Sequence, residues 1–204
     1  MPDFTLERAC PGPVAGIDEA GRGPWAGPVV AAAVILPEDR APASLLECLD
    51  DSKKLRKTVR ERLRPEIEAV ASFAIGIATP AEIDELNILQ ATLLAMRRAC
   101  TGLSIHPASA LVDGNRPPQL SCAVQTVVKG DSRSFSIAAA SILAKTARDD
   151  IMTDLARKYP GYGWERNAGY GTKEHQNALS RLGVTPVHRR SFAPIRDLLS
   201  RCSD

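Results

Sequence analysis

The stretch that decides the fold is residues 14–36, which read VAGIDEAGRGPWAGPVVAAAVIL. Its first part, Val14–Asp18, has the apolar character of a strand and runs into the glycine-rich loop Gly21-Arg22-Gly23-Pro24. Val29–Leu36 is an unbroken apolar run of strand length, and Pro37 closes it. Apolar runs of this length bounded by glycine and proline are typical of buried strands. We therefore expect two consecutive strands at the start of a sheet.

The rest of the chain alternates between helical and strand patterns. A helix capped by Ser52 is expected to run to about Val70, and the turn-rich Tyr159–Gly171 is expected to be a loop. Further helices are expected at 80–101, 137–155 and 173–182, and further strands at 72–78, 108–112 and 123–129. Early consecutive strands followed by helix-linked strands predict an α/β fold, in which helices cover a mixed sheet.

Composition limits the class of protein. With 204 residues, 44% of them hydrophobic, the chain suits one domain, with a core over about 1–155 and a C-terminal loop and helices over about 156–204. The longest apolar run, Val29–Leu36, is too short to cross a membrane, and the N-terminus lacks the order of a signal peptide. Five scattered cysteines without C-x-x-C spacing argue against disulfides or zinc and favour the cytoplasm.

Charge is unevenly distributed along the chain. Residues 129–204 carry 13 basic and 8 acidic side chains, and seven lysines and arginines crowd into residues 53–64, although the net charge is only +2. Such patches suit a polyanion such as a nucleic acid. A solvated helix face explains the same pattern, so charge alone leaves both interpretations open.

Acidic residues follow three of the predicted strands. Asp18 and Glu19 end the first, Asp113 ends another before Gly114, and Asp131 follows Gly130 after a third. Strand ends of an α/β sheet converge on a ligand-binding crevice. Each acid alone is also ordinary turn chemistry, but three such sites together favour a metal centre. Because neighbouring strand residues point to opposite faces, Asp18 and Glu19 share a metal only if the strand ends or twists there.

Grouped carboxylates without histidine or cysteine partners suit Mg²⁺ or Mn²⁺ better than Zn²⁺. A cation is needed because the acids would otherwise raise one another's pKa. Two such ions, roughly 3.5–4 Å apart, activate a water and stabilise the leaving oxygen of a phosphodiester. The sequence therefore predicts a metal-dependent phosphodiesterase.

Several blocks of the sequence resemble bacterial ribonuclease HII. The blocks follow the order of that family and span nearly the whole chain. They are residues 14–24 (VAGIDEAGRGP), 51–55 (DSKKL), 112–115 (VDGN), 128–131 (VKGD), 137–145 (IAAASILAK), 169–172 (GYGT) with His175, and 188–192 (HRRSF). Two residues depart from the family pattern, namely Trp25 in place of a smaller aliphatic residue and Ala168 in place of lysine.

The resemblance implies a five-stranded mixed sheet of the RNase H-like type with a helical C-terminal part. It implies that the metal-binding and catalytic acids are Asp18, Glu19, Asp113 and Asp131. It also implies hydrolysis of RNA in RNA–DNA hybrids and cleavage 5′ of ribonucleotides embedded in duplex DNA, leaving 3′-hydroxyl and 5′-phosphate ends. The substrate-binding residues that it implies are Gly21, Arg22, Gly23, Lys53, Lys54, Asn115 and Tyr170.

Their expected roles differ. The glycine loop would read the 2′-hydroxyl, Tyr170 would stack at the RNA-to-DNA junction, and Lys53 and Lys54 would contact phosphates. Lys145 either faces the site or is an ordinary surface lysine. Ser141 and Asn115 could donate hydrogen bonds near the acids, whereas His175, His188, Trp164 and Phe135 are expected to be structural.

Two other classes of protein compete with this interpretation. One is a nucleic-acid-binding module of the same fold without catalysis, but an acidic crevice would repel a phosphate backbone. The other is a different RNase H-like enzyme, such as an integrase or a type 1 ribonuclease H, which the glycine loop and Tyr170 argue against. The expected partners are RNA–DNA hybrids and ribonucleotide-containing DNA, and we expect a monomer without a membrane or an obligate protein partner.

Overall fold

The computed structural model describes residues 1–50, 52 and 55–201, with the side chain of Arg201 left out. A five-stranded sheet in the order β3-β2-β1-β4-β5 forms its centre. The first three strands pair antiparallel, whereas β1–β4 and β4–β5 are parallel, so the predicted mixed sheet is confirmed. The strands are β1 (Val14–Ala20), β2 (Val29–Ile35), β3 (Ser72–Ala78), β4 (Ser109–Asp113) and β5 (Ala123–Val127).

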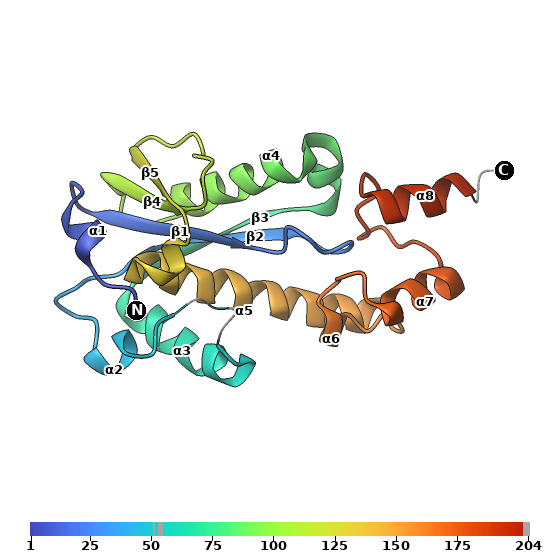
Figure 1. Ribbon diagram of the computed structural model, residues 1–204, viewed down its shortest axis with the longest axis horizontal. Coiled ribbons are helices and arrows are strands. Elements are labelled where there is room, and N and C mark those ends of the chain that lie inside the picture. Colours follow the sequence, from blue (N-terminus) through green and yellow to red (C-terminus); the bar gives the residue numbers. More distant parts are fainter. Residues whose placement is uncertain (51, 53–54, 202–204) are drawn as a thin grey trace.

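Helices cover both faces of this sheet (Figure 1). The helix α4 packs on one face against β1, β2 and β3, and α5 packs on the other face, where α3 lies beside it. The helices are α1 (Thr5–Arg8), α2 (Ala43–Leu46), α3 (Lys57–Val70), α4 (Pro80–Thr101), α5 (Phe135–Lys158), α6 (Trp164–Asn167), α7 (Lys173–Leu182) and α8 (Ala193–Arg201), with the 3₁₀ turn η1 (Gly130–Ser132) before α5. No helix of the described ranges is long and apolar enough to cross a bilayer.

Small residues allow α5 to lie close to the central strand. Ala138, Ala139 and Ala140 are fully buried in the core on this side of the sheet. A Cβ atom added to Gly16 of β1 would lie 2.2 Å from the main-chain carbon of Ser136, so only glycine fits there. The run of alanines therefore brings the helix axis close to the strand that carries Asp18.

Local signals explain where α4 begins and bends. Thr79 and Glu82 form a capping box, in which each side chain accepts a hydrogen bond from the main chain of the other residue. Asn87 interrupts the helix with a φ of 69°, and its side chain accepts hydrogen bonds from the N–H groups of Leu89 and Gln90. The helix is therefore two capped segments joined at a bend.

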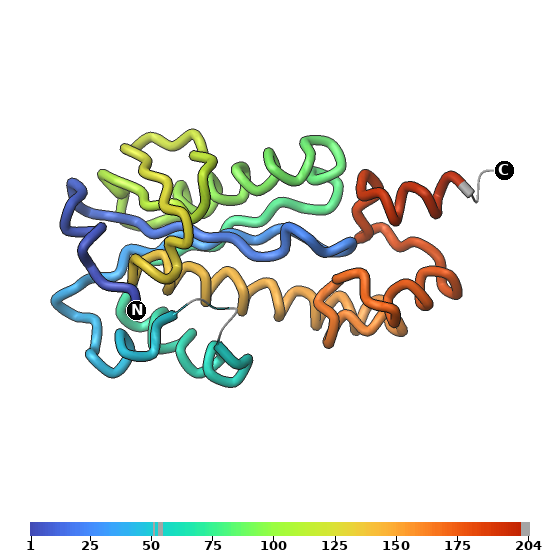
Figure 2. Tube along the Cα trace, viewed as in Figure 1, coloured from blue at the N-terminus to red at the C-terminus, as the bar shows by residue number. Residues whose placement is uncertain are grey.

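The C-terminal elements dock on the loop between β1 and β2. In Figure 2 this loop reaches the segment that carries α6 to α8, at the opposite end of the molecule from the N-terminus. Trp25 donates a main-chain hydrogen bond to Gly169, and Gly27 donates one to Val187. A separate apolar cluster around Trp164 and Met152 fills the space between the loop and the C-terminal helices. The second half of the loop, residues 25–27, thus packs against residues from the end of the chain.

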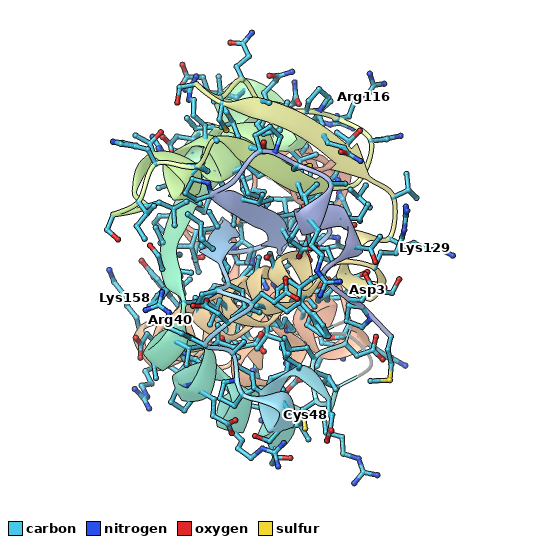
Figure 3. The ribbon with its side chains drawn as sticks, turned by 90° about the vertical axis from the view of Figure 1, so that its left-hand side faces the viewer. Asp3, Arg40, Cys48, Arg116, Lys129 and Lys158 are labelled. Carbon is cyan, nitrogen blue, oxygen red and sulfur yellow. The ribbon has the colours of Figure 1, made fainter. Side chains whose placement is uncertain are left out.

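Several predicted bounds are wrong. The helix expected from Ser52 begins at Lys57, because the Ser52 hydroxyl accepts a hydrogen bond from Ser141 at 2.6 Å instead of capping a helix. The strand expected to reach Lys129 stops at Val127, because Lys129 adopts a left-handed conformation with a φ of 55°. Figure 3 shows Lys129 projecting from the surface, on the side of the molecule between Arg116 and Cys48.

Candidate active site

The sheet register brings two of the predicted acids together. Ile17 of β1 pairs with Val112 of the parallel strand β4, so Asp18 and Asp113 follow at the same level on neighbouring strands. The third, Asp131, lies in the turn η1 directly after β5, and the N–H of its neighbour Gly130 donates a hydrogen bond to Asp113 Oδ1 at 2.7 Å. Strand pairing and one main-chain hydrogen bond therefore place these acids at one end of the sheet.

Glu19 differs from the other acids in its surroundings. The strand β1 continues to Ala20 and does not end at Asp18 as predicted, so Asp18 and Glu19 remain in regular pairing with β2. The N–H of Glu19 donates to Asp18 Oδ1 at 2.7 Å, and the Glu19 carboxylate forms an ion pair with Arg22 at 3.2 Å. Glu19 thus connects the acidic cluster to the glycine loop.

The four acids interact electrostatically at Asp18, which is only 4% exposed. Burial raises the pKa of the Asp18 carboxyl well above its usual value, and the charges of Glu19, Asp113 and Asp131 raise it further. The hydrogen bond from the Glu19 N–H acts in the opposite direction. The structure therefore brings all four predicted acids together, in an arrangement that disfavours the charged form of Asp18 unless a cation is added.

In the described part of the chain, no three histidine, cysteine or acidic side chains lie in a ready metal-binding geometry. Two of the carboxylate oxygens are engaged by main-chain N–H groups, and Glu19 is paired with Arg22. The cluster still fits a hard divalent cation, because all of its donors are carboxylate oxygens.

The glycine loop and Tyr170 form one continuous surface. Gly21 has a φ of 95°, which favours glycine, and Arg22 and Gly23 are exposed. A Cβ atom added to Gly23 would lie 3.4 Å from Cε1 of Tyr170, whose side chain is 50% exposed. The structure therefore brings together the residues that the resemblance assigns to the 2′-hydroxyl and to the junction.

A chain of buried histidines holds the main chain of Tyr170. The N–H of Thr185 donates to His188 Nδ1 at 2.9 Å, so His188 carries its proton on Nε2 and donates it to His175 Nε2 at 3.0 Å. Trp164 Nε1 donates to the same atom at 3.2 Å. His175 Nδ1 is therefore the protonated nitrogen and donates to the Tyr170 carbonyl at 3.0 Å. Both histidines are structural, as predicted.

The two departures from the family pattern lie close to this loop. The Trp25 ring packs on Gly171, where an added Cβ atom would lie 2.1 Å from the ring atom Cζ2. Ala168 has a left-handed conformation with a φ of 48°, and its carbonyl accepts a hydrogen bond from Arg148 at 3.0 Å. Both residues therefore support the loop that carries Tyr170.

The remaining predicted residues lie in several places. Lys53 and Lys54 are outside the described residues, but the preceding Ser52 is held by Ser141 and by Arg60, which donates to its carbonyl at 2.9 Å. Asn115 is exposed, two positions after Asp113. Lys145 forms an ion pair with Asp149 at 2.5 Å on its own helix. Among these residues, only Asn115 is a near neighbour in sequence of one of the acids.

Two buried arginines near the loop were not singled out from the sequence. Arg148 is 1% exposed and Arg189 is fully buried. Arg189 belongs to the block of residues 188–192, but nothing in the sequence showed that its side chain would be buried against the glycine loop. The position of Arg189 within a block shared with the family was the one feature of the sequence that could have indicated a role for it.

Comparison with known proteins identifies close relatives. The family model described as Ribonuclease HII matches residues 15–195. The chain is 63% identical over 195 residues to a ribonuclease HII of Paramagnetospirillum magneticum, covering 96% of this chain and 97% of that protein. It is 60% identical over 203 residues to a ribonuclease HII of Rhodospirillum rubrum, covering 98% and 93%.

A solved structure is similar as well. The ribonuclease H2 of Pyrococcus horikoshii superposes with a TM-score of 0.78 at 28% identity, covering 94% of this chain and 99% of that one. The overall fold is therefore shared with a ribonuclease of this type.

Proposed function

Because this chain belongs to the ribonuclease HII family, whose members hydrolyse the RNA strand of RNA–DNA hybrids, we propose that it also cuts 5′ of ribonucleotides embedded in duplex DNA. The products are a 3′-hydroxyl and a 5′-phosphate end. The observation that carries the proposal is the meeting of four carboxylates, Asp18, Glu19, Asp113 and Asp131, beside the glycine loop and Tyr170.

The four acids would hold two Mg²⁺ or Mn²⁺ ions. When bound, such ions supply positive charge that stabilises the attacking and leaving oxygens of a phosphodiester. The Gly130 N–H fixes the Asp113 carboxylate, and the Glu19 N–H fixes that of Asp18. Arg22 offsets part of the charge of Glu19, and its exposed side chain is proposed to contact the substrate. The protein thus orients its acids through main-chain hydrogen bonds before any ligand binds.

Substrate recognition is assigned to the surface next to the acids. The loop Gly21-Arg22-Gly23 approaches the sugar and contacts the 2′-hydroxyl, which distinguishes RNA from DNA. Tyr170 stacks beside it at the RNA-to-DNA junction, with its main chain held by His175. Lys53, Lys54 and Asn115 are proposed to contact the phosphate backbone and the adjoining nucleotides. We propose action as a monomer in the cytoplasm, without an obligate protein partner.

Catalysis is tested with Mg²⁺ and a duplex that holds one ribonucleotide. Asp113→Asn should abolish cleavage and leave duplex binding largely intact, since it removes one charged ligand and conserves shape. The matched control is Asp154→Asn, which alters an exposed acid on α5 and should cleave like the unmodified protein. Binding without cleavage by the unmodified protein would favour the catalytically silent module. Near-normal cleavage by Asp113→Asn would remove Asp113 from the catalytic set.

Recognition is tested with Tyr170→Ala on two substrates. Cleavage at a single embedded ribonucleotide should fall more than cleavage within a long RNA stretch, because a long hybrid offers many registers. Stacking of this kind contributes roughly 1–3 kcal/mol per base. Equal losses on the two substrates would mean that Tyr170 only supports the loop.

A further inference from the structure

The arginine pair behind the glycine loop binds main-chain carbonyls. Arg148 donates to the carbonyls of Pro28, Ala168 and Ala26 at 3.0, 3.0 and 3.2 Å. Arg189 donates to four carbonyls, two at each end of the loop. Together the two guanidiniums form seven hydrogen bonds to main-chain oxygens of the described residues. Arg148 therefore holds the return end of the loop, at residues 26 and 28, whereas Arg189 holds both ends.

Arg189 alone reaches the part of the loop that is proposed to meet the sugar. Its Nη2 donates to the Gly21 carbonyl at 2.5 Å and its Nη1 donates to the Arg22 carbonyl at 2.9 Å. It also donates to the carbonyls of Gly27 and Pro28, at 2.9 and 3.1 Å. One planar side chain therefore fixes the first two peptide groups of the loop relative to its return to the sheet.

The orientation of the carbonyls determines that of the neighbouring N–H groups. In a trans peptide the C=O and N–H bonds point in opposite directions. Because Arg189 holds the carbonyls of Gly21 and Arg22, the N–H groups of Arg22 and Gly23 point away from the guanidinium. Within the described residues neither N–H has a hydrogen-bond acceptor, and the exposed Tyr170 ring flanks Gly23. Two donors are thus turned outward on the surface proposed to read the 2′-hydroxyl.

Burying this side chain is costly for the fold. Desolvation, together with the charge of Arg148, lowers the pKa of Arg189 to about 9, so the group remains protonated at neutral pH. A buried charge without a carboxylate partner is expensive, and an apolar residue of similar size often gives a more stable protein. Packing alone therefore does not explain an arginine here, whereas the need for several donors in one plane does.

We propose that Arg189 is a positioning residue for recognition of the ribose, which holds the first two loop peptides so that the N–H groups of Arg22 and Gly23 face the 2′-hydroxyl. The inference rests on the proposed function, because it assumes that this loop reads the sugar. The orientation of these two N–H groups is thus set by a fully buried residue of the C-terminal segment, which binds the opposite side of the loop peptides and does not contact the substrate.

The first test compares Arg189→Lys with Arg148→Lys. Arg148 is the matched control, because it is equally buried in the same cluster but does not bind the carbonyls of Gly21 and Arg22. Fluorescence anisotropy in the presence of a chelator measures Kd for a duplex with one ribonucleotide and for an all-DNA duplex of the same sequence. The Kd for the all-DNA duplex divided by the Kd for the ribonucleotide duplex reports recognition of one hydroxyl. A general loss of stability does not change this ratio.

Arg189→Lys should reduce this ratio about 2- to 10-fold, the value of one well-aligned hydrogen bond, and leave the Kd for all-DNA duplex unchanged. Arg148→Lys should keep the ratio. A ratio preserved in Arg189→Lys, or reduced equally in both variants, overturns the inference while cleavage by the unmodified protein upholds the proposed function. A ratio of one in the unmodified protein also overturns the inference, whereas the absence of cleavage at the ribonucleotide overturns the proposed function.

A second measurement needs no variant and covers the case in which Arg189→Lys does not fold. Amide hydrogen exchange of Arg22 and Gly23 should be fast in the free protein and slow on binding the ribonucleotide duplex, but not on binding all-DNA duplex. Slow exchange in the free protein, or equal protection by both duplexes, would show that these N–H groups are not held open for the hydroxyl.

Discussion

The buried histidine pair should make the stability of the protein depend on pH. His188 is 1% exposed, and burial, assisted by the neighbouring His175, lowers its pKa from 6.5 to about 4. His188 Nδ1 accepts from Thr185 and His175 Nε2 accepts from two donors, so protonation of either nitrogen would break a hydrogen bond. The folded chain therefore holds the neutral form, and the unfolded chain takes up a proton first.

The size of the effect follows from these pKa values. Because the folded pKa is lowered, the contribution of His188 is fully present above pH 6.5 and is lost as the pH falls towards 4. Between pH 7 and pH 5 the free energy of unfolding should decrease by about 2 kcal/mol from this residue alone. His175, whose pKa burial also lowers, acts in the same direction.

The assay is urea unfolding followed by circular dichroism at pH 7 and pH 5, for the unmodified protein and for His188→Asn, which does not titrate. The variant is less stable at pH 7, but its decrease between the two pH values should be smaller by about 2 kcal/mol. His106→Asn, at an exposed histidine, is the control and should keep the full decrease. An identical pH dependence in His188→Asn and the unmodified protein would refute the account of the histidine pair.

Three further predictions concern the scaffold. Gly16→Ala should lower the free energy of unfolding by about 1–3 kcal/mol, because the new Cβ atom meets the Ser136 main chain, and an unchanged melting temperature would contradict the close approach of α5. Ala168→Gly should raise the melting temperature by a few degrees, since relief of a left-handed conformation, about 1–2 kcal/mol, exceeds the entropy cost of glycine. Arg98 and the capping box lower the pKa of Glu82 to about 2, so the free energy of unfolding should decrease as the pH falls from 4.5 to 2. Glu82→Gln should make this decrease smaller. An equal decrease in both proteins would mean that Glu82 does not stabilise the helix.

The regular elements were largely predictable because their signals are local. The strands 72–78 and 29–35 and the helix 173–182 follow from apolar patterns, capping residues and flanking glycine or proline. The errors arose where a distant residue changed the local outcome. Ser52 looks like a helix cap, but its hydroxyl is bound by Ser141, which lies 89 positions away. The short α6 and the final α8 carry too few periodic positions to be recognised beside turn-rich sequence.

That the acids would lie close together was predictable, because β1 and β4 are parallel neighbours and their register places Asp18 beside Asp113. The predicted end of β1 at Asp18 was wrong, because the strand continues to Ala20. The support of the glycine loop was not predictable. Arg189 and Arg148 are charged residues, which sequence reasoning assigns to the surface, and both are buried only because main-chain carbonyls from elsewhere surround them. His175 and His188 appear unrelated in the sequence and become one unit only in the fold.

The hydrogen bond from Arg189 to the Gly21 carbonyl joins residues 168 positions apart. A ribosome therefore releases β1, β4 and their acids well before it releases the side chain that shapes the loop beside them. During synthesis the acidic end of the sheet can form first, whereas the carbonyls of Gly21 and Arg22 lack their guanidinium donor until the C-terminal segment emerges and docks. The proposed discrimination between ribose and deoxyribose would accordingly be among the last properties that a nascent chain acquires, and a truncation before Arg189 should remove it while leaving the five strands in place.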